Sequence, residues 1–313
     1  MADPIHALIG PTASGKESFA LAVAPLLGAE ILSLDSMKVY REMDIGTAKA
    51  SNAARAAVPH HLLDLADPAD DFTTRRWLSA AEQALSLVRA RSRLPLFVGG
   101  TALYLKALLH GLFEGPAAQP SIRARLHAMP VEERFALLAR IDPLSAARLH
   151  PNDARRVVRA LEIFEVTGNP ASSLRREWES ATPPARAVLL GIRRPRPELY
   201  ARIDQRVARM VGAGLVEEVR ALLARPGGVG STARQALGYK EVADFLEGRS
   251  PSLEEALRVL RTRTRNFARR QLTWFKRFPI RWIDVGADET PVRVAPRIVA
   301  QLRADEPPGT NRT

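Results

Sequence analysis

The 313-residue sequence contains no cysteine. This absence excludes a disulfide-stabilised scaffold, a catalytic thiol, and any zinc or iron–sulfur site built on thiolates. It is consistent with a reducing compartment. Function classes that depend on cysteine chemistry are therefore excluded before any motif is considered.

Long hydrophobic runs are also missing. The longest weakly polar stretch, Phe19 to Ala29, is interrupted by Pro25 and Gly28 and is too short to span a membrane. The N-terminus, Met1 to Pro4, has no basic segment, and the apolar run Ile5 to Ile9 is too short for the core of a signal peptide. We therefore expect a soluble, cytoplasmic protein that does not contact membranes.

Acidic residues are scarce relative to basic ones. The chain has 34 Asp and Glu against 46 Lys and Arg, a net charge of +12, and six of the 46 are Lys, so 40 are Arg. An excess of Arg over Lys can reflect the base composition of a genome, but a positive charge of this size also attracts polyanions. The position of the charge along the chain has to decide between these interpretations.

The remaining composition, 46% hydrophobic and 26% charged, is that of an ordinary globular protein, and the length suits two domains or one domain with an insertion. Short apolar runs alternate with segments of helical spacing over the first hundred residues. The runs are Ile5 to Ile9, Glu30 to Leu34 and Leu94 to Val98, and the helical segments include Phe19 to Leu27 and Trp77 to Ala90. This alternation predicts an α/β fold with a parallel sheet flanked by helices.

The pattern changes after Leu112. From Gly115 to Pro184 the chain has Arg-rich helical segments separated by Pro and no convincing strand, and an apolar strand returns at Ala187 to Ile192. We therefore predict a core in two parts, 1–114 and 187–303, with a helical insertion domain at 115–186 and a disordered tail at 304–313. Within the insertion, a helix is expected between a capping Asn152 and Gly168, with an apolar face of Val157, Val158, Leu161 and Phe164.

The strongest local motif is GPTASGK, which directly follows the first strand and directly precedes a helix. It consists of Gly10, Pro11, Thr12, Ala13, Ser14, Gly15 and Lys16. In this context the spacing is that of a P-loop, in which backbone N–H groups and the helix N-terminus surround a phosphate and the Lys supplies a charge. The sequence therefore predicts a phosphate-binding, P-loop NTPase-like sheet.

One position departs from the P-loop pattern. The residue after the P-loop Lys is normally a Ser or Thr that holds magnesium, and here it is Glu17. Its carboxylate could bind the ion directly, could leave that task to Ser18 or to water, or could simply suit the positive end of the helix. The residues alone do not decide among these alternatives.

Two further polar loops follow strands. Asp35 comes directly after Glu30 to Leu34, and the segment GGTALY, which includes Thr101, follows Leu94 to Val98. Because the carboxyl ends of parallel strands meet at one edge of a sheet, we expect Asp35 and Thr101 to lie beside the P-loop. A turn aspartate and a helix N-cap are the ordinary alternatives for these two residues.

Basic residues concentrate in one segment. Nine lie between Arg258 and Arg281, with no Asp or Glu among them. Arg258, Arg261, Arg265 and Arg269 follow helical spacing, and Leu260, Phe267 and Trp274 recur every seventh residue on another face. The segment is predicted to be an amphipathic helix with a basic face that contacts RNA or DNA, because no acidic residue within it offsets the repulsion. Its aromatic residues could stack on bases, although packing in the core is the more common role.

Taken together, these segments resemble the bacterial tRNA dimethylallyltransferases, also called tRNA isopentenyltransferases. The resemblance runs nearly from end to end. It is carried by GPTASGK, DSMKVYREMDIGTAK from Asp35, HHLLDLADP from His60, GGTALYLKALLHGL from Gly99, HPNDARRVVRALEIFEVTGNP from His150, RIDQRVARMVGAGLVEEV from Arg202, QALGYKE from Gln235 and TRNFARRQLTWFKR from Thr264.

The resemblance implies an enzyme that transfers a dimethylallyl group from dimethylallyl diphosphate to N6 of the adenosine on the 3′ side of the anticodon. In that reaction the P-loop residues Gly10 to Glu17 hold the donor's diphosphate, with Mg²⁺ near Glu17 or Ser18, and do not hydrolyse ATP. Asp35 takes the proton of the attacking amine. Lys16, the P-loop amides, Thr101 and the metal ion meet the charge of the leaving diphosphate.

The resemblance also implies a tRNA surface that binds the anticodon stem-loop, and a monomeric enzyme. The target adenine has to be flipped into the site. The implied contacts are Asp35, Ser36, Met37 and Lys38 around the base, together with Arg123, Arg155, Arg156, Arg159, Arg234, Gln235, Gly238, Tyr239, Lys240, Arg261, Arg265 and Arg269. Lys38 departs from the Gln of the family pattern DSxQVY and can only donate hydrogen bonds. The zinc finger of eukaryotic relatives is absent.

Overall fold

The computed structural model describes residues 4–113, 115–181 and 185–304. It divides into two compact units. Unit 1 is Met1–Leu109 with Ala185–Thr313, and unit 2 is His110–Pro184. The predicted tail, 304–313, lies outside the described residues except for Ala304.

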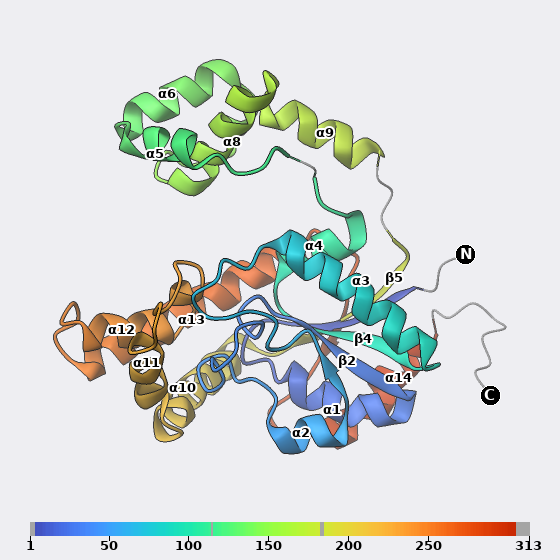
Figure 1. Ribbon diagram of the computed structural model, residues 1–313. Helices are drawn as coiled ribbons and strands as arrows, with labels where there is room; N and C mark the ends of the chain where they lie inside the picture. The colour runs from blue at the N-terminus through green and yellow to red at the C-terminus, as the bar shows by residue number, and fades with distance from the viewer. Residues whose placement is uncertain (1–3, 114, 182–184, 305–313) are drawn as a thin grey trace. The chain divides into compact units, whose positions relative to one another are not determined.

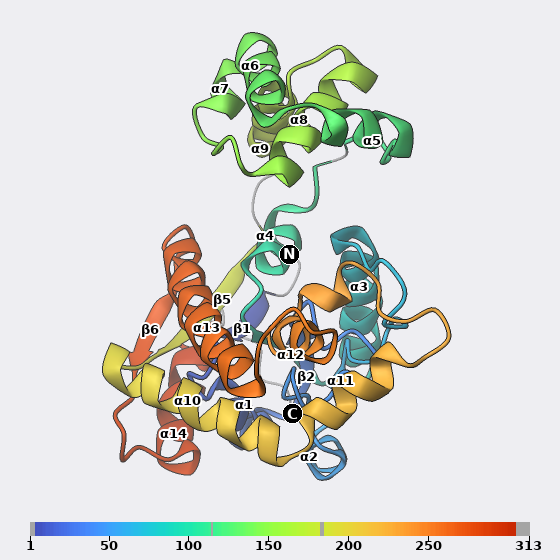
Figure 2. The same cartoon turned by 90° about the vertical axis from the view of Figure 1, so that its left-hand side faces the viewer.

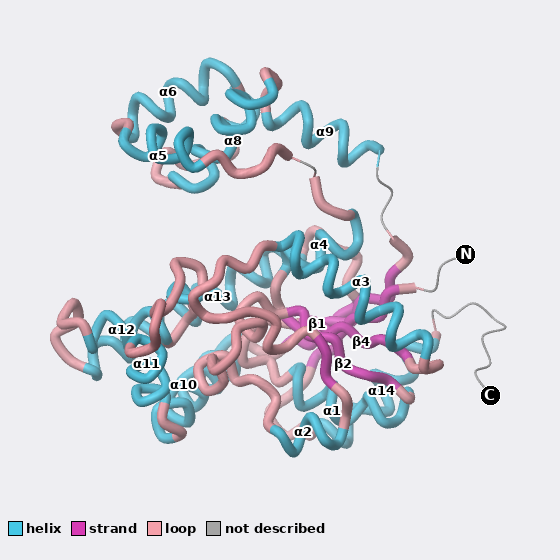
Figure 3. The backbone as a smooth tube through the Cα atoms, in the orientation of Figure 1, coloured by secondary structure: helices cyan, strands magenta, loops and turns pink. Residues whose placement is uncertain are grey.

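Unit 1 is built on a six-stranded sheet with the strand order β3-β2-β4-β1-β5-β6, and every pair of neighbours is parallel. The strands are β1 (Ile5–Ile9), β2 (Ala29–Leu34), β3 (His60–His61), β4 (Leu94–Gly99), β5 (Ala187–Arg193) and β6 (Arg281–Asp284). Figure 3 shows the strands gathered in the middle of unit 1 with helices around them. The predicted α/β class with a parallel sheet is confirmed. The short strands β3 and β6 were not expected.

The register of the sheet aligns three strand ends. Ile9 is opposite Gly99, and Leu34 is also opposite Gly99. The loops that follow β1, β2 and β4 therefore leave the sheet side by side, with β4 in the middle. This register fixes the P-loop, Asp35 and the GGT segment at one edge of the sheet.

Helices cover both faces of the sheet because the strands are apolar on both sides. One face packs against α1 (Lys16–Leu27) and α14 (Pro291–Arg303), and the other against α3 (Thr74–Ala90) and α4 (Ala102–His110). On the second face Trp77 stacks on Tyr104 with ring centroids 4.2 Å apart. These two cores make the sheet a rigid base for its loops.

Further helices of unit 1 lie beyond the carboxyl ends of the strands (Figure 2). They are α10 (Arg196–Gly212), α11 (Leu215–Leu223), α12 (Tyr239–Leu246) and α13 (Leu253–Phe275), with a 3₁₀ turn at Ala233–Gln235. The small helix α2 (Asn52–Ala57) follows the long loop after β2. No helix in the described ranges is long and apolar enough to cross a membrane.

Unit 2 is helical throughout its described residues. It contains α5 (Pro120–Ala128), α6 (Val131–Ile141), α7 (Pro143–Ala146), α8 (Ala154–Thr167) and α9 (Ala171–Ala181). Its core includes Leu126, Leu138 and Leu161. The N-cap of α8 is Asp153, whose side chain accepts a hydrogen bond from the Arg156 amide, so the expected cap at Asn152 is wrong by one residue. Gly168 ends the helix in the left-handed conformation, as predicted.

Candidate functional site

The chain turns from β1 into α1 through the predicted phosphate-binding loop. Ala13 and Gly15 have positive φ angles of 64° and 90°, and Gly15 is the N-cap of α1. A loop of this kind directs successive backbone N–H groups to one side, where they can bind an anion together with the helix N-terminus. Within the loop, three residues are buried: Gly10, Pro11 and Ser14. The other four line a cavity: Thr12, Ala13, Gly15 and Lys16.

Two arginines bind the backbone carbonyl oxygens of this loop. Arg194 donates from Nε to the carbonyl oxygen of Ser14 at 2.9 Å, and Arg202 donates from Nε to that of Ala13 at 3.0 Å. These contacts fix the conformation of the loop. The Thr12 and Ser14 amides donate within the protein, to Gln271 and to the Pro11 carbonyl oxygen, so the remaining amides of the loop are the ones left for a ligand.

Gln271 of α13 ties the P-loop to the GGT segment. Its Oε1 accepts from the Thr12 amide, and its Nε2 donates to the Gly100 carbonyl oxygen, both at 2.8 Å. A Cβ atom at Gly100 would lie 2.3 Å from Nε2, so this close approach requires glycine. Sequence reasoning missed Gln271. The available signal was a polar residue within the buried stripe of α13, which includes Leu260, Thr264, Ala268 and Phe275.

Asp35 occupies the loop after β2, at the edge of the same cavity. Its Oδ1 accepts hydrogen bonds from the amides of Met37 at 2.8 Å and Lys38 at 3.4 Å. The hydroxyl oxygen of Thr101 accepts from the Ser36 amide at 3.1 Å. These contacts fix the carboxylate and leave Oδ2 without a partner among the described residues. Thr101 thus supports the Asp35 loop and is not among the residues that line the cavity.

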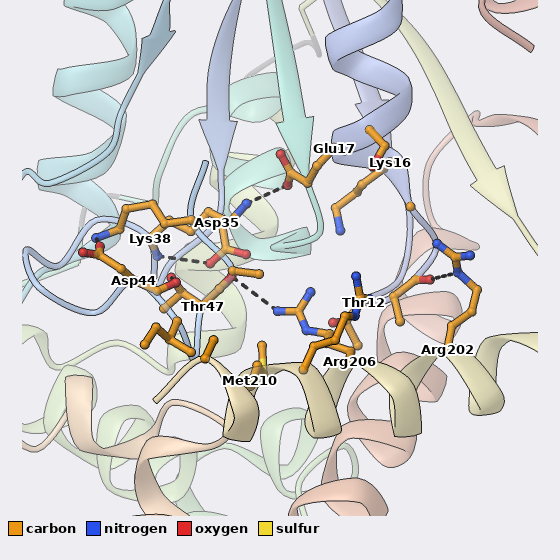
Figure 4. Close-up of a pocket in the computed structure, with 18 of the residues that line it drawn as sticks. Thr12, Lys16, Glu17, Asp35, Lys38, Asp44, Thr47, Arg202, Arg206 and Met210 are labelled. Atoms are coloured by element: carbon orange, nitrogen blue, oxygen red, sulfur yellow. Dashed lines mark hydrogen bonds and ion pairs between the residues drawn. The ribbon is translucent and has the colours of Figure 1, made fainter. Parts of the chain in front are cut away.

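The cavity has a volume of about 520 Å³ (Figure 4). Its cationic lining comes from α1, the loop after β2 and α10, and consists of Lys16, Lys38, Lys49, Arg202, Arg206 and Arg209. Asp44 and Asp64 form ion pairs with Lys49, which leaves the other five cations facing two carboxylates, Glu17 and Asp35. The excess of positive charge makes this cavity suited to a multiply charged anion.

Burial shapes the charge of the cavity. It lowers the pKa of Lys16 to about 8, and it lowers the pKa of Arg206 against the opposing effect of Asp35. Burial opposes ionisation of Glu17, but Lys38 and Lys16 outweigh it and keep the pKa of that carboxyl below its usual value. A buried cation such as Lys16 binds an incoming anion more strongly than the same group fully exposed to water.

The residues near Glu17 do not fit a magnesium site held by protein side chains. Mg²⁺ in phosphate sites takes one or two carboxylates together with the substrate's oxygens. The Glu17 carboxylate is already bound to the Lys38 ammonium group at 2.9 Å, and Ser18 is an exposed residue at the cavity wall. Within the described ranges no three His, Asp or Glu side chains group together to hold a metal ion.

Comparisons with known proteins agree with this geometry. Residues 38–278 match the sequence profile of the family described as IPP transferase, and residues 3–60 match that of Isopentenyl transferase. The chain belongs to the IPP transferase family. The resemblance drawn from the motifs is therefore confirmed.

Relatives of this IPP transferase are similar over most of their length. The chain is 45% identical to tRNA dimethylallyltransferase 1 of Citrifermentans bemidjiense over 276 residues, 88% of this chain and 90% of the relative. It is 42% identical to the tRNA dimethylallyltransferase of Pelotomaculum thermopropionicum over 288 residues, 90% and 91% of the two chains.

Solved structures share the fold of this IPP transferase. The tRNA isopentenylpyrophosphate transferase of Bacillus halodurans is 36% identical, with a TM-score of 0.70 over 97% of this chain and 98% of that chain. A eukaryotic dimethylallyltransferase acting on tRNA is 25% identical, with a TM-score of 0.82 over 99% and 82%. The predicted P-loop NTPase-like fold is thus confirmed.

The basic segment of this IPP transferase differs from its prediction. Helix α13 ends at Phe275, Lys276 and Arg277 follow it, and Arg281 begins β6, so the nine charges do not share one element. Acidic residues outside the segment also offset part of the charge. Arg258 pairs with Glu255, Arg263 with Glu241, and Arg265 with Asp204.

The remaining arginines of α13 are Arg261, Arg269 and Arg270, which have no ion-pair partner among the described residues. The buried stripe of the helix also differs from the predicted face, because Phe267 and Trp274 are only partly buried while Phe275 is fully buried. Phe267 lines the cavity, and the guanidinium of Arg277 lies 4.6 Å from the Trp274 ring centroid. The exposed basic surface is therefore smaller than the sequence suggested.

Residues of the GYK segment are mostly engaged within unit 1. Tyr239 is buried and donates to Glu218, which also accepts from the Ile45 amide, and this contact together with burial raises the pKa of Tyr239. A Cβ atom at Gly46 would lie 2.3 Å from the Tyr239 ring. Arg234 pairs with Glu247, Lys240 pairs with Asp244, Gly238 is the N-cap of α12, and Gln235 is exposed.

In unit 2, two of the predicted RNA contacts bind a buried carboxylate. Arg123 donates two hydrogen bonds to Glu162, at 2.9 and 3.0 Å, and Arg159 also donates to it. Arg156 pairs with the N-cap Asp153 at 3.1 Å. Arg155 is exposed on the same helix. Arg123 and Arg159 thus stabilise the interior of unit 2, and their side chains are also partly exposed at its surface.

Proposed function

We propose that this chain transfers a dimethylallyl group from dimethylallyl diphosphate to N6 of the adenosine on the 3′ side of the anticodon in tRNA, with release of diphosphate. The observation that carries the proposal is a cavity in which a P-loop, an excess of cationic side chains and one fixed carboxylate, Asp35, lie together. The names of the relatives, tRNA dimethylallyltransferases, support it.

Diphosphate is held by the P-loop amides, Lys16 and Arg206. As the C–O bond to the prenyl chain breaks, negative charge accumulates on the leaving diphosphate, and these groups stabilise it without having to move. Because Lys16 is the first residue of α1, the positive end of the helix dipole stabilises the same anion. Because the residues near Glu17 do not fit a magnesium ion, the chain's own cationic groups and amides stabilise the leaving diphosphate.

Asp35 acts as the general base. The adenine amine forms a C–N bond to the first carbon of the prenyl chain, and the proton that it loses passes to the carboxylate, for which the unpartnered Oδ2 is available. The amides of Met37 and Lys38 orient the other oxygen. General-base assistance of this kind contributes roughly 10²- to 10⁴-fold in rate.

The nucleic acid partner is the anticodon stem-loop, and the enzyme acts as a cytoplasmic monomer. The target base has to leave its stack to reach Asp35, at a cost of a few kcal/mol. Contacts between basic side chains and the phosphates around the loop offset this cost. Arg261 and Arg269 are two of the three arginines of α13 without an ion-pair partner among the described residues, and they are the contacts of unit 1 that we expect to contribute most.

A direct assay tests the function. The purified chain is incubated with dimethylallyl diphosphate and an unmodified tRNA carrying adenosine 3′ of its anticodon, and nucleosides are analysed by mass spectrometry. We expect one dimethylallyl group on that adenosine and none on a tRNA with guanosine at the position. Failure to modify, alongside an active relative as a positive control, would reject the proposal. ATP-dependent phosphate transfer to RNA would instead assign a kinase.

A further inference from the structure

The two sequence positions that depart from their expected patterns contact each other. Glu17 stands where a P-loop has Ser or Thr, and Lys38 stands where the pattern after Asp35 has Gln. One lies in the first turn of α1 and the other in the loop after β2. The Lys38 Nζ lies 2.9 Å from Glu17 Oε1, as Figure 4 shows.

The ion pair is built into the cavity. The Lys38 side chain is 6% exposed and that of Glu17 is 38% exposed, and both line the cavity beside Lys16. The backbone of Lys38 is fixed on both sides, because its amide donates to Asp35 Oδ1 and its carbonyl oxygen accepts from the Asp64 amide at 3.2 Å. The ammonium group is therefore held near Glu17 by a rigid loop.

A carboxylate beside a P-loop needs a positive partner if a diphosphate is to bind. Alone, Glu17 would repel the anion, and a divalent cation between the two would turn this repulsion into attraction. The Lys38 ammonium group already neutralises the carboxylate. A magnesium ion on Glu17 would have to break this ion pair and leave the buried ammonium without its partner, which is costly.

We propose that Glu17 and Lys38 are a matched pair in which the Lys38 ammonium group takes the charge-neutralising place of a divalent cation beside the P-loop. Diphosphate is then held by cationic side chains and backbone amides, and its binding depends little on magnesium. This inference rests on the proposed function in one respect, since it takes the cavity to be the diphosphate site.

The first test measures the affinity of the full chain for inorganic diphosphate by isothermal titration calorimetry, once with excess EDTA and once with millimolar MgCl₂. For the unaltered chain we expect dissociation constants that agree within about threefold, less than the effect of one charge-assisted hydrogen bond. Binding more than about tenfold tighter with magnesium overturns the inference.

Variants of the pair sharpen the test. Lys38→Gln leaves an unneutralised carboxylate, so we expect diphosphate affinity in EDTA to fall by about tenfold or more and magnesium to restore much of it. The double variant Glu17→Thr with Lys38→Gln recreates the usual hydroxyl, and its affinity should rise by about tenfold on adding magnesium. Glu17→Gln removes the charge with little change of shape and is the reserve variant if Lys38→Gln is unstable.

A matched control is Glu254→Gln with Lys276→Gln, which makes the same charge changes at opposite ends of α13. Its diphosphate affinity should not change.

The coupling of the pair is measured by comparing Glu17→Gln, Lys38→Gln and the variant that carries both substitutions. If the two effects on diphosphate affinity simply add in the double variant, the two residues are not a pair and the inference fails. Prenyl transfer is assayed in parallel. Expected diphosphate binding without transfer rejects only the proposed function, whereas transfer with strongly magnesium-dependent binding rejects only the pair.

Discussion

The cavity and helix α13 are both rich in basic residues, but they hold their charges differently. In the cavity, Lys16 and Arg206 hydrogen-bond to backbone carbonyl oxygens, of Pro11 and Thr47, and have no acidic partner within the described residues. On α13, Arg258, Arg263 and Arg265 are each ion-paired with a Glu or Asp. Each region carries six basic side chains, but three are ion-paired on α13 and two, Lys38 and Lys49, in the cavity. More of the cavity's charges are therefore available to a ligand.

This difference shows why a count of charges along the chain is a poor measure of binding strength. An ion-paired arginine at the surface has to exchange one partner for another when it binds a phosphate, so its net gain is small. A buried cation that has only a neutral carbonyl for a partner gains much more. We therefore expect substitutions in the cavity to have larger effects than substitutions on α13.

The largest effect is expected at Asp35. Asp35→Asn keeps the shape of the side chain and removes the base, so the single-turnover rate of prenyl transfer should fall by roughly 10²- to 10⁴-fold. Affinity for tRNA, measured by filter binding, should change less than about twofold. Asp70→Asn, an exposed loop residue, is the control. An equal loss of rate and of tRNA affinity would assign Asp35 to RNA binding.

Lys16 should have the next largest effect. Lys16→Met removes one charge-assisted hydrogen bond to diphosphate, which corresponds to a loss of affinity of roughly 10- to 150-fold. Calorimetry with inorganic diphosphate measures this loss directly. Lys276→Met, at the exposed end of α13, is the matched control and should bind as the unaltered chain does. If the two variants bind diphosphate equally well, the P-loop is not the diphosphate site.

The pH dependence of diphosphate binding follows from the lowered pKa of Lys16, about 8. The charged form binds, so affinity should be full below pH 8 and should fall by up to about tenfold per pH unit above it. Lys16→Arg keeps its charge throughout this range and controls for titration of the ligand itself. If diphosphate affinity depends on pH in the same way in the unaltered chain and in Lys16→Arg, then Lys16 does not titrate in this pH range.

The arginines of α13 should have the smallest effects, and these should depend on ion pairing. The double variant Arg261→Ala with Arg269→Ala removes two unpaired charges. A plot of log affinity for tRNA against log salt concentration should then become less steep, its negative slope decreasing in magnitude by about 1.5 to 2. Arg258→Ala with Arg265→Ala removes two paired charges and should change the slope by less than about 0.5. Equal changes in both double variants would remove the distinction between paired and unpaired arginines.

Much of the site could be predicted because its signals are local. The strand Ile5–Ile9, the glycine-containing loop and Lys16 are consecutive in the chain, and parallel strands necessarily bring Asp35 to the same edge. The sheet follows from the same alternation of apolar runs. A strand of two residues such as β3 carries too little pattern to be recognised.

The remaining contacts could not be predicted because they join distant segments. Gln271 binds Gly100 across 171 positions, and Arg265 binds Asp204 across 61. In neither pair does one residue indicate the position of the other in the sequence. The two members of each pair meet only because α13 packs against α10 and the sheet. For the same reason nothing in the sequence links Glu17 to Lys38, whose charged groups lie 2.9 Å apart in the structure.

The cavity should bind diphosphate, while α13 should bind RNA. The most direct measurement tests each variant with the ligand of the other region. The affinity for tRNA is measured for Lys16→Met, and the affinity for diphosphate is measured for the Arg261→Ala and Arg269→Ala double variant. Each value should agree with that of the unaltered chain within about twofold. A loss of about tenfold in both would contradict the division between the two basic regions.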